Sequence, residues 1–268
     1  MDETLDYINI TVSCASDPGK QETNRDCCGY RCGKETVISN YGTFTAYEKI
    51  EGNLPFLTAV ADGKVLFDDP HSIEDRAQSK AISLILYSMY KDFFKDEDKQ
   101  IAIDLLNQHI LYHCKAEYPA VAVAALGIKD NMIHTMHTGS CAILRIHDSK
   151  VERLTPLKLS KVAETYLGTP DRPGHDMTVF AKYPLCEGDT WILASDGVME
   201  PFTGLDYDLD DNKILWLLGL NTDNHAALLV RSAAETYYPV YERSYCTDSH
   251  TAVVIHIGNG ENETDPVY

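Results

Sequence analysis

Much of the chain consists of short apolar runs separated by turn-forming residues, a pattern typical of β-strands. The clearest strands are predicted at 7–14 (YINITVSC), 55–61 (PFLTAVA), 190–195 (TWILAS) and 251–257 (TAVVIHI). Further strands are predicted at 121–128, 132–138 and 141–147, with short hairpin strands within 27–47. The segment 151–182 is mixed and predicts no single element. Short strands that follow one another in this way pair as antiparallel sheets.

Apolar residues at helical spacing interrupt the strands in two parts of the chain. Between 72 and 94 they recur every three or four positions, and Ser72 with Asp75 supplies a helix cap. Further helices are predicted at about 96–118, 212–220 and 225–238. Strands and helices therefore occur in separate runs, which favours an α+β fold rather than an alternating one. We expect a β-sandwich of two antiparallel sheets flanked by helices.

The domain organisation follows from the absence of an internal repeat, a low-complexity tract or a linker in the sequence. Residues 1–258 are predicted to form a single domain. The polar segment 259–268 (NGENETDPVY) is predicted to be a mobile tail. No apolar stretch approaches the roughly 18 consecutive residues that a membrane helix needs.

The composition restricts location and partners. The chain has 41 acidic and 23 basic residues, a formal net charge of −18. Nucleic acids and anionic membranes attract basic surfaces, so neither is expected to bind here. The start, MDETLDYINI, does not resemble a signal peptide, which predicts a cytoplasmic protein whose eight cysteines are free thiols. Cys27, Cys28 and Cys32 lie close in sequence, but no second pair at zinc-finger spacing accompanies them.

Three aspartates stand where an apolar strand meets a loop. Asp62 and Asp196 follow their strands, and Asp248 precedes the last one. If these strands are neighbours, the carboxylates converge at one sheet edge, where a cation must offset their repulsion. Oxygen ligands suit Mg²⁺ or Mn²⁺, and a pair of such ions activates water for attack on phosphorus. The alternative is that each aspartate is an ordinary turn or capping residue.

Several segments resemble, in order, the motifs of the metal-dependent type 2C protein phosphatases. These segments are 24–26 (NRD), 59–63 (AVADG), 137–144 (HTGSCAIL), 188–197 (GDTWILASDG) and 248–254 (DSHTAVV). The second and fourth are similar to the family's V-A-D-G and G-D-x-x-L-L-x-S-D-G. The set extends over nearly the whole chain, which resembles a divergent, bacterial-type member of the family.

The resemblance implies a four-layer α-β-β-α sandwich with two Mn²⁺ or Mg²⁺ ions at its centre. By position, Asp62 would bridge both ions and Gly63 would offer its backbone carbonyl to one. Asp196 and Asp248 would bind the other ion, and Asp26 would hold metal-bound water. The reaction implied is hydrolysis of phosphoserine or phosphothreonine in a phosphorylated protein substrate, without a phosphoenzyme intermediate. A cognate Ser/Thr kinase is the partner that such a reaction implies.

The sequence departs from the family mainly in the groups that would bind the phosphate. The family usually has an arginine shortly before the early asparagine, whereas 19–24 (GKQETN) contains none. Lys64 follows Asp62 and Gly63, where the family commonly has Met or His. Two interpretations of Lys64 stay open: a positive charge near the phosphate, counted among the catalytic candidates, or a solvated loop residue.

Further departures concern a third metal ion and the residue pair after Asp248. Gly139 and Cys141 occupy the Asp and Arg positions of the family's G-D-S-R, which puts a third ion in doubt. Three other acids remain near the motifs in sequence: Asp189, Glu200 and Asp206. His250 is either a metal ligand or proton donor, or a surface or packed residue with no chemical role.

Two alternatives to an active protein phosphatase stay open. A pseudophosphatase would keep the fold as a regulatory or binding module, and a related hydrolase would act on a small phosphorylated molecule. Cysteine-based phosphatase chemistry is disfavoured, because Cys27, Cys28 and Cys32 have Arg31 beside them without the spacing of a phosphate-binding loop.

Overall fold

The structure is a computed structural model. It describes residues 7–19, 24–51, 54–63, 77–114, 120–155, 166–168, 174–203, 209–238, 243–244 and 249–258. Several features predicted from the sequence lie outside these residues: Lys64, Asp206, Asp248, the cap formed by Ser72 and Asp75, and the tail at 259–268.

The first sheet contains six antiparallel strands in the order β4-β1-β14-β11-β8-β9. Their bounds are β4 Gly42–Glu51, β1 Tyr7–Asp17, β14 His250–Ile257, β11 Thr190–Ala194, β8 Ala142–His147 and β9 Lys150–Arg153. β14 is central, and its Val253 pairs with Cys14 on one side and Leu193 on the other. A strand covered on both faces reads as a continuous apolar run, which explains the sequence TAVVIHI.

The second sheet also contains six antiparallel strands, in the order β10-β7-β6-β5-β2-β3. Their bounds are β10 Val179–Pro184, β7 Met132–Thr138, β6 Val121–Lys129, β5 Phe56–Gly63, β2 Asp26–Cys32 and β3 Glu35–Ser39. β5 is buried on both faces: Val60 points into the space between the sheets, whereas Leu57 and Ala59 point outward to the helices. Its apolar run therefore ends only at Asp62.

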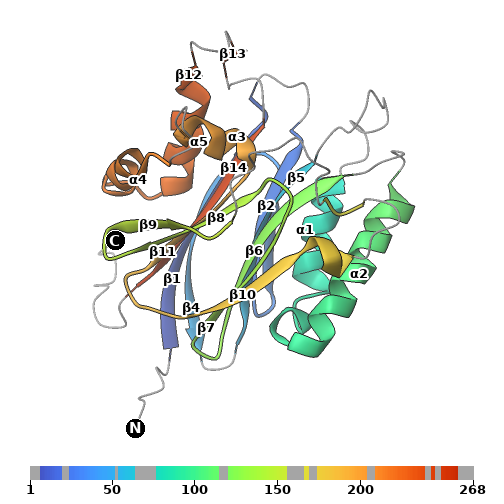
Figure 1. The fold of residues 1–268 in the computed structure, drawn as a ribbon. Coiled ribbons are helices and arrows are strands. Elements are labelled where there is room, and N and C mark those ends of the chain that lie inside the picture. Colours follow the sequence, from blue (N-terminus) through green and yellow to red (C-terminus); the bar gives the residue numbers. More distant parts are fainter. Residues whose placement is uncertain are drawn as a thin grey trace.

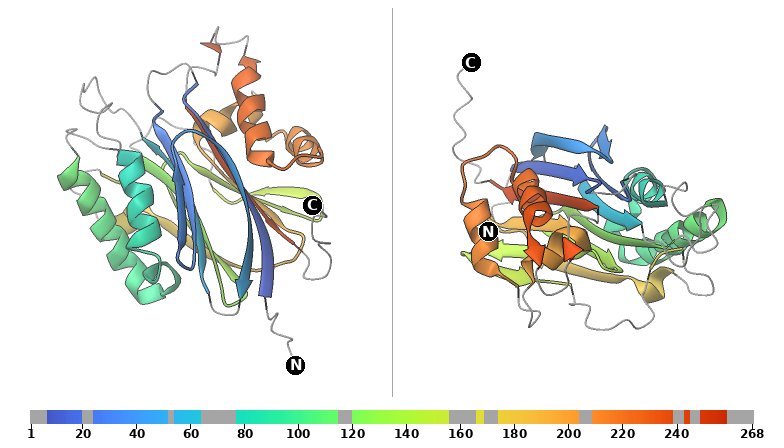
Figure 2. Two further views of the ribbon diagram at one scale, coloured as in Figure 1. Left: turned by 180° about the vertical axis from the view of Figure 1, so that it is seen from behind. Right: turned by 90° about the horizontal axis from the view of Figure 1, so that it is seen from above.

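The two sheets pack face to face and enclose a common core. Trp191 and Leu193 from the first sheet belong to the same buried cluster as Phe56 and Val60 from the second. Figure 2 shows the two sheets as adjacent layers when the molecule is seen from above. This packing places the ends of β5, β11 and β14 near one another across the sandwich.

Helices cover the outer face of each sheet, which gives the four layers expected from the sequence (Figure 1). The helices are α1 Ala77–Tyr87 and α2 Asp96–His113 on the second sheet, and α3 Asp196–Met199, α4 Asp211–Leu218 and α5 His225–Glu235 on the first. Short 3-10 segments and a two-stranded ribbon complete the described structure: η2 Asp92–Phe94, η3 Gly174–Met177, η4 Glu200–Phe202, β12 Tyr237–Tyr238 and β13 Arg243–Ser244. Within the described ranges, no helix has the length and apolar character needed to span a membrane.

The structure differs from the sequence-based expectation in four places. One is the helix expected at 225–238, which ends at Glu235 and is followed by β12. The strands expected within 27–47 are not one hairpin, because β4 leaves β2 and β3 and pairs with β1 in the other sheet. The mixed segment 151–182 contributes to β9 and β10, two edge strands whose half-exposed faces give a weak pattern. The helix expected over 72–94 stops at Tyr87, and the segment reaches Phe94 through a separate 3-10 turn.

Candidate metal centre

Two buried carboxylates face each other on adjacent strands of the second sheet. Asp26 is the first residue of β2, and it pairs directly with Asp62 near the end of β5. Only 1% of Asp26 and 4% of Asp62 is exposed to solvent. Directly paired residues in an antiparallel ladder have Cα atoms about 4.5–5.5 Å apart. The fold thus holds two acidic side chains together in a nearly dry environment.

This donor set fits a hard divalent cation. Burial disfavours an ionised carboxylate, and a second carboxylate nearby disfavours it further, whereas a cation reverses both effects. Carboxylate and carbonyl oxygens are the protein ligands that Mg²⁺ and Mn²⁺ prefer. The predicted metal ligands Asp62 and Gly63 are consecutive at the end of β5, with Asp26 beside them.

The packing around position 63 gives a steric reason for glycine there, apart from its predicted role as a metal ligand. The backbone N–H of Gly63 donates to the carbonyl of Arg25 at 2.8 Å, which joins the ends of β5 and β2. A Cβ atom at this position would lie 2.9 Å from Oε1 of Gln78 on α1. Glycine therefore lets α1 pack closely against the end of β5, a steric reason that the sequence alone does not give.

Asp196 begins α3 directly after β11, and it is partly buried. The preceding residue, Ser195, is fully buried and fixes this junction to β14. Its backbone N–H donates to the carbonyl of Thr251 at 2.9 Å, and the N–H of Thr251 donates to the Ser195 hydroxyl at 3.0 Å. The start of α3 and the start of β14 are thus locked together.

Hydrogen bonds connect this junction to the loop before β2. The hydroxyls of Thr251 and Ser16 lie 2.6 Å apart, and the Asn24 side-chain amide donates to the Ser16 hydroxyl at 2.9 Å. The Asn24 side-chain oxygen accepts from the backbone N–H of Asp26 at 2.9 Å. Asp26, Asp62 and Asp196 consequently lie at the same end of the sandwich, the end at which α3 begins (Figure 1).

Two predicted site residues, Asp248 and Lys64, fall outside the described residues, but their chain neighbours lie at this end. Ser249 accepts a hydrogen bond from the backbone N–H of Arg25, with a distance of 3.1 Å from N to Oγ. Gly63, which precedes Lys64, donates its backbone N–H to the carbonyl of Arg25. Asp248 as a ligand and Lys64 as a phosphate contact therefore stay predictions.

Comparison with known proteins identifies the fold. No protein-family model and no curated protein matches the sequence. The catalytic domain of the serine/threonine protein phosphatase PstP, solved with two manganese ions, matches with a TM-score of 0.62 and 16% identity, covering 94% of this chain and 100% of that chain. The S. agalactiae serine/threonine phosphatase matches with a TM-score of 0.63 and 16% identity, covering 92% and 99%. The phosphatase domain of SpoIIE from Bacillus subtilis matches with a TM-score of 0.56 and 16% identity, covering 98% of each chain.

This chain has the type 2C protein phosphatase fold. The two antiparallel sheets and the flanking helices that the element order and the motifs predicted are confirmed, and the structure shows six strands in each sheet. At this level of identity the likeness establishes the fold, so the chemistry has to be argued from the side chains.

One departure from the type 2C motifs has a steric cause. Gly139 has a φ of +74°, and a Cβ atom there would lie 2.5 Å from the Cβ of Ala122. Ala122 is itself the partner of Asp62 on β6, so the backbone of this turn lies close to the carboxylates. The hydroxyl of the next residue, Ser140, lies 3.5 Å from Oδ2 of Asp62. The turn thus places the Ser140 hydroxyl beside Asp62, whereas the position of the family's carboxylate, one residue earlier, is Gly139.

Sequence reasoning gave Ser140 no role, although it lies within a quoted motif. The only signal was its position in the turn after β7. The pairing of β6 with both β5 and β7, which brings that turn toward Asp62, is visible only in the structure.

Of the acids suggested for a third ion, Asp189 lies away from this centre, Glu200 lies one helical turn after Asp196, and Asp206 is outside the described residues. Asp189 precedes β11, whereas Asp196 follows it, so the length of the strand separates them. Glu200 is exposed one turn after Asp196, in η4. His250, whose role was left open, is fully buried as the first residue of β14, which rules out a simple surface residue.

The cysteine-rich segment does not form an alternative site. Successive residues of a strand point to opposite faces, and Cys27 lies among the helix-side residues whereas Cys28 lies in the core between the sheets. Burial raises the pKa of the Cys27 thiol, and burial with nearby Glu48 raises that of Cys32 to about 12. A protonated thiol is a poor nucleophile, so cysteine-based chemistry is disfavoured here. The seven described cysteines are free thiols.

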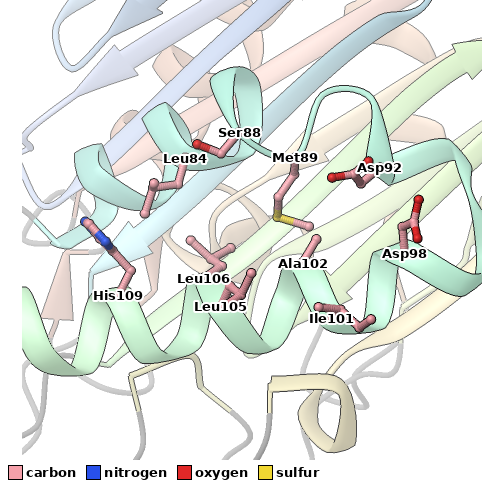
Figure 3. A pocket seen from close by; sticks show the side chains of 10 residues that line it. All are labelled: Leu84, Ser88, Met89, Asp92, Asp98, Ile101, Ala102, Leu105, Leu106 and His109. Carbon is pink, nitrogen blue, oxygen red and sulfur yellow. The ribbon is translucent and has the colours of Figure 1, made fainter.

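A groove of about 570 Å³ lies elsewhere, between α1 and α2 (Figure 3). Its lining is mostly apolar, with acidic residues at one end: Leu84, Ser88, Met89, Asp92, Asp98, Ile101, Ala102, Leu105, Leu106 and His109. None of the predicted metal ligands or catalytic residues lines it.

Proposed function

We propose that this chain is a metal-dependent phosphatase that hydrolyses phosphoserine and phosphothreonine in proteins. The observation that carries the proposal is the buried pair Asp26 and Asp62, placed opposite each other at the same end of the sandwich as Asp196. A further support is that the PstP catalytic domain, which shares the fold, was solved with two manganese ions.

Each acidic residue has a proposed role. Asp62, Gly63 through its carbonyl, Asp196 and Asp248 would hold two Mn²⁺ or Mg²⁺ ions. When bound, the ions supply the positive charge that activates water and offsets charge on the phosphoryl oxygens. Asp26 would accept hydrogen bonds from water beside Asp62, and outer partners of this kind orient the reacting groups.

The surrounding residues orient these ligands. Ser140 approaches the outer oxygen of Asp62, and the bonds between Ser195 and Thr251 fix the direction in which Asp196 leaves β11. Lys64 follows the metal ligands in sequence and is proposed to bring a positive charge to the substrate phosphate. A lysine is a point charge, so this contact would lack the two-pronged geometry that an arginine provides. A Ser/Thr kinase with the same substrate is the proposed partner.

One observation favours a second candidate, a pseudophosphatase that binds phosphoproteins with little turnover. The contact between Gly139 and Ala122 leaves no room for a carboxylate at that position. A centre limited to two ions would then bind metal and ligand with reduced catalysis.

The decisive experiment compares wild type with Asp196→Asn. Hydrolysis of a phosphothreonine peptide and of p-nitrophenyl phosphate is measured with Mn²⁺ and with chelator. Wild type is expected to need the metal, and Asp196→Asn is expected to lose activity by at least about 100-fold, because a ligand is removed. The matched control is Asp223→Asn, which makes the same charge change at an exposed loop position and is expected to keep full activity.

The outcomes separate the candidates. Activity without metal, or activity that survives Asp196→Asn, would contradict a metal-dependent phosphatase. Metal binding without turnover of any substrate would indicate the pseudophosphatase. A strong preference for small phosphate esters over every phosphopeptide would indicate a small-molecule hydrolase.

A further inference from the structure

A second group of metal-ligating side chains lies at the other end of the first sheet. His147 is the last residue of β8, and Cys186 and Asp189 lie in the loop between β10 and β11. One ligand atom from each of the three lies within 4.8 Å of the others. The β8–β9 hairpin that carries His147 projects from the left side of the sandwich in Figure 1.

This cluster is separate from the carboxylate centre. Along β11, Thr190 pairs with Ile146, next to the cluster, whereas Ala194 pairs with Ala142 near the start of α3. Asp189 and Asp196 are seven positions apart in sequence, and a strand rises by about 3.3 Å per residue. The two groups therefore lie roughly 20 Å apart, at opposite ends of one strand.

The three side chains are already arranged around a buried acid. Asp189 is 0% exposed; its Oδ1 lies 2.6 Å from Nδ1 of His147, and its Oδ2 accepts from Nε of Arg145 at 2.7 Å. A backbone bond from Asp189 N–H to the Cys186 carbonyl, at 3.3 Å, forms the turn that brings the thiol beside the carboxylate. His147 is exposed, Cys186 is half-buried and Asp189 is fully buried, so the three side chains form a small site that is open to solvent on one side.

We propose that His147, Cys186 and Asp189 bind a zinc ion. Imidazole nitrogen, thiolate sulfur and carboxylate oxygen are the three ligand types that Zn²⁺ accepts, whereas Mg²⁺ and Mn²⁺ avoid sulfur. Three protein ligands leave a fourth tetrahedral position. Water would fill it, while Asp148, whose Oδ2 lies 3.4 Å from the other ring nitrogen of His147, would orient the ring from outside the site.

Arg145 supports this site from outside it. Its Nη2 donates to Sγ of Cys186 at 3.3 Å, a contact that holds the sulfur beside Asp189. Its Nε holds the oxygen of Asp189 that points away from His147, as outer-shell partners of metal-binding carboxylates do. Zinc would bind the sulfur of Cys186 as a thiolate and a ring nitrogen of His147 that carries no hydrogen, which are the forms that coordinate metal.

Binding would add a link between two segments that already meet where β11 pairs with β8. His147 belongs to the β8–β9 hairpin at the edge of the first sheet, and Cys186 belongs to the connection from the second sheet back to the first. We expect the ion to be structural and to stabilise this corner, with no part in phosphate hydrolysis.

The test uses Co²⁺ as a spectroscopic substitute for Zn²⁺ in the reduced full-length protein. A thiolate bound to Co²⁺ gives a near-ultraviolet charge-transfer band, which the all-oxygen carboxylate centre does not give. Wild type is expected to show the band with one equivalent of Co²⁺ and to lose it when Zn²⁺ is added. Cys186→Ser and His147→Ala are expected to remove or strongly weaken it, and Zn²⁺ should raise the melting temperature of wild type more than that of these variants, which keep the carboxylate centre.

Two controls make the result specific. Cys114→Ser changes another half-buried thiol, at the end of α2, and should keep the band. Asp196→Asn should also keep it, so failure of the carboxylate centre and failure of the zinc site are distinguishable. Absence of the band in wild type, its persistence in Cys186→Ser, or saturation only at millimolar Co²⁺ would overturn the proposal.

Discussion

At the scale of single residues, the two glycines near the carboxylates have different reasons to be glycine. Gly63 makes room for Gln78, whereas Gly139 combines a left-handed backbone with close contact to Ala122. From the sequence, Gly139 is visible only as a missing acid. Its backbone conformation and its neighbour come from the pairing of β6 with β7, which no local pattern records.

Gly139→Ala is expected to destabilise the protein by about 2–4 kcal/mol, because strain at positive φ adds to overpacking against Ala122. The matched control is Gly42→Ala, since Gly42 has a φ of +80° with no atom within 4 Å of the added Cβ. That control should cost only about 1 kcal/mol. Urea unfolding measures both, and equal losses would contradict the steric explanation.

His134 is expected to make stability depend on pH. Burial, together with the charges of Lys182 and Lys99, lowers the pKa of His134 to about 4 in the folded state, from 6.5. Between pH 4 and 6.5 the His134 side chain binds a proton in the unfolded chain but not in the folded protein. The folded state therefore has its full stability above pH 6.5 and loses stability as the pH falls toward 4. Because the side chain is only half-buried, we expect about 1–2 kcal/mol.

His134→Gln tests this expectation. The difference in unfolding free energy between wild type and the variant is measured in urea at pH 7.5 and pH 5.0, which cancels the titration of all other groups. Wild type should lose stability relative to the variant at the lower pH. A difference that is the same at both pH values would show that His134 does not titrate in this range.

At the scale of elements, α2 shows how one helix serves both the core and the surface. Ile103 is 0% exposed and packs toward the second sheet, whereas Ile101 is 63% exposed at the groove between α1 and α2. Successive helical positions point about 100° apart, so residues this close in sequence reach different environments.

Ile103→Ala is expected to cost about 2–5 kcal/mol, through lost burial and the cavity left behind. Ile101→Ala removes the same atoms from a solvent-exposed position and should change stability by less than about 0.5 kcal/mol. Thermal or urea unfolding of the two variants measures the difference. Similar losses would mean that the outer face of α2 is more buried than the structure shows.

Element prediction succeeded where both faces of a strand are covered. β5, β11 and β14 are central strands, so their apolar runs are continuous and their ends are marked by the first polar residue. β9 and β10 lie at sheet edges, where half-exposed residues weaken the pattern. The transfer of β4 to the other sheet depends on pairing with β1, which local sequence does not specify.

At the scale of the whole molecule, the carboxylate centre couples stability to metal. The sequence predicted that acids would converge, because three strand ends carried them. It could not predict the direct pairing of Asp26 with Asp62, which depends on the register of β2 against β5. Two buried like charges lower stability when no cation is bound.

Asp62→Asn is therefore expected to be more stable than wild type in chelator, by about 1–2 kcal/mol, while losing activity. Saturating Mn²⁺ at about 100 times its dissociation constant should stabilise wild type by about 2.7 kcal/mol and the variant by less. Melting curves with and without Mn²⁺ measure both effects, with Asp223→Asn as the control of equal charge change. A variant less stable than wild type in chelator would show that the two carboxylates do not repel.

The central position of β14 has a consequence for synthesis on the ribosome. This strand comes after every other described strand in the chain, yet it lies between β1 and β11 and joins the two halves of the first sheet. Until it emerges, β1 has no partner on that side, and the hydrogen bonds from Ser195 to Thr251 have not formed. A nascent chain would expose two unpaired strand edges for much of its translation. Asp196 is thus fixed in place only after β14 has paired, so the proposed metal centre would be assembled at the end of synthesis.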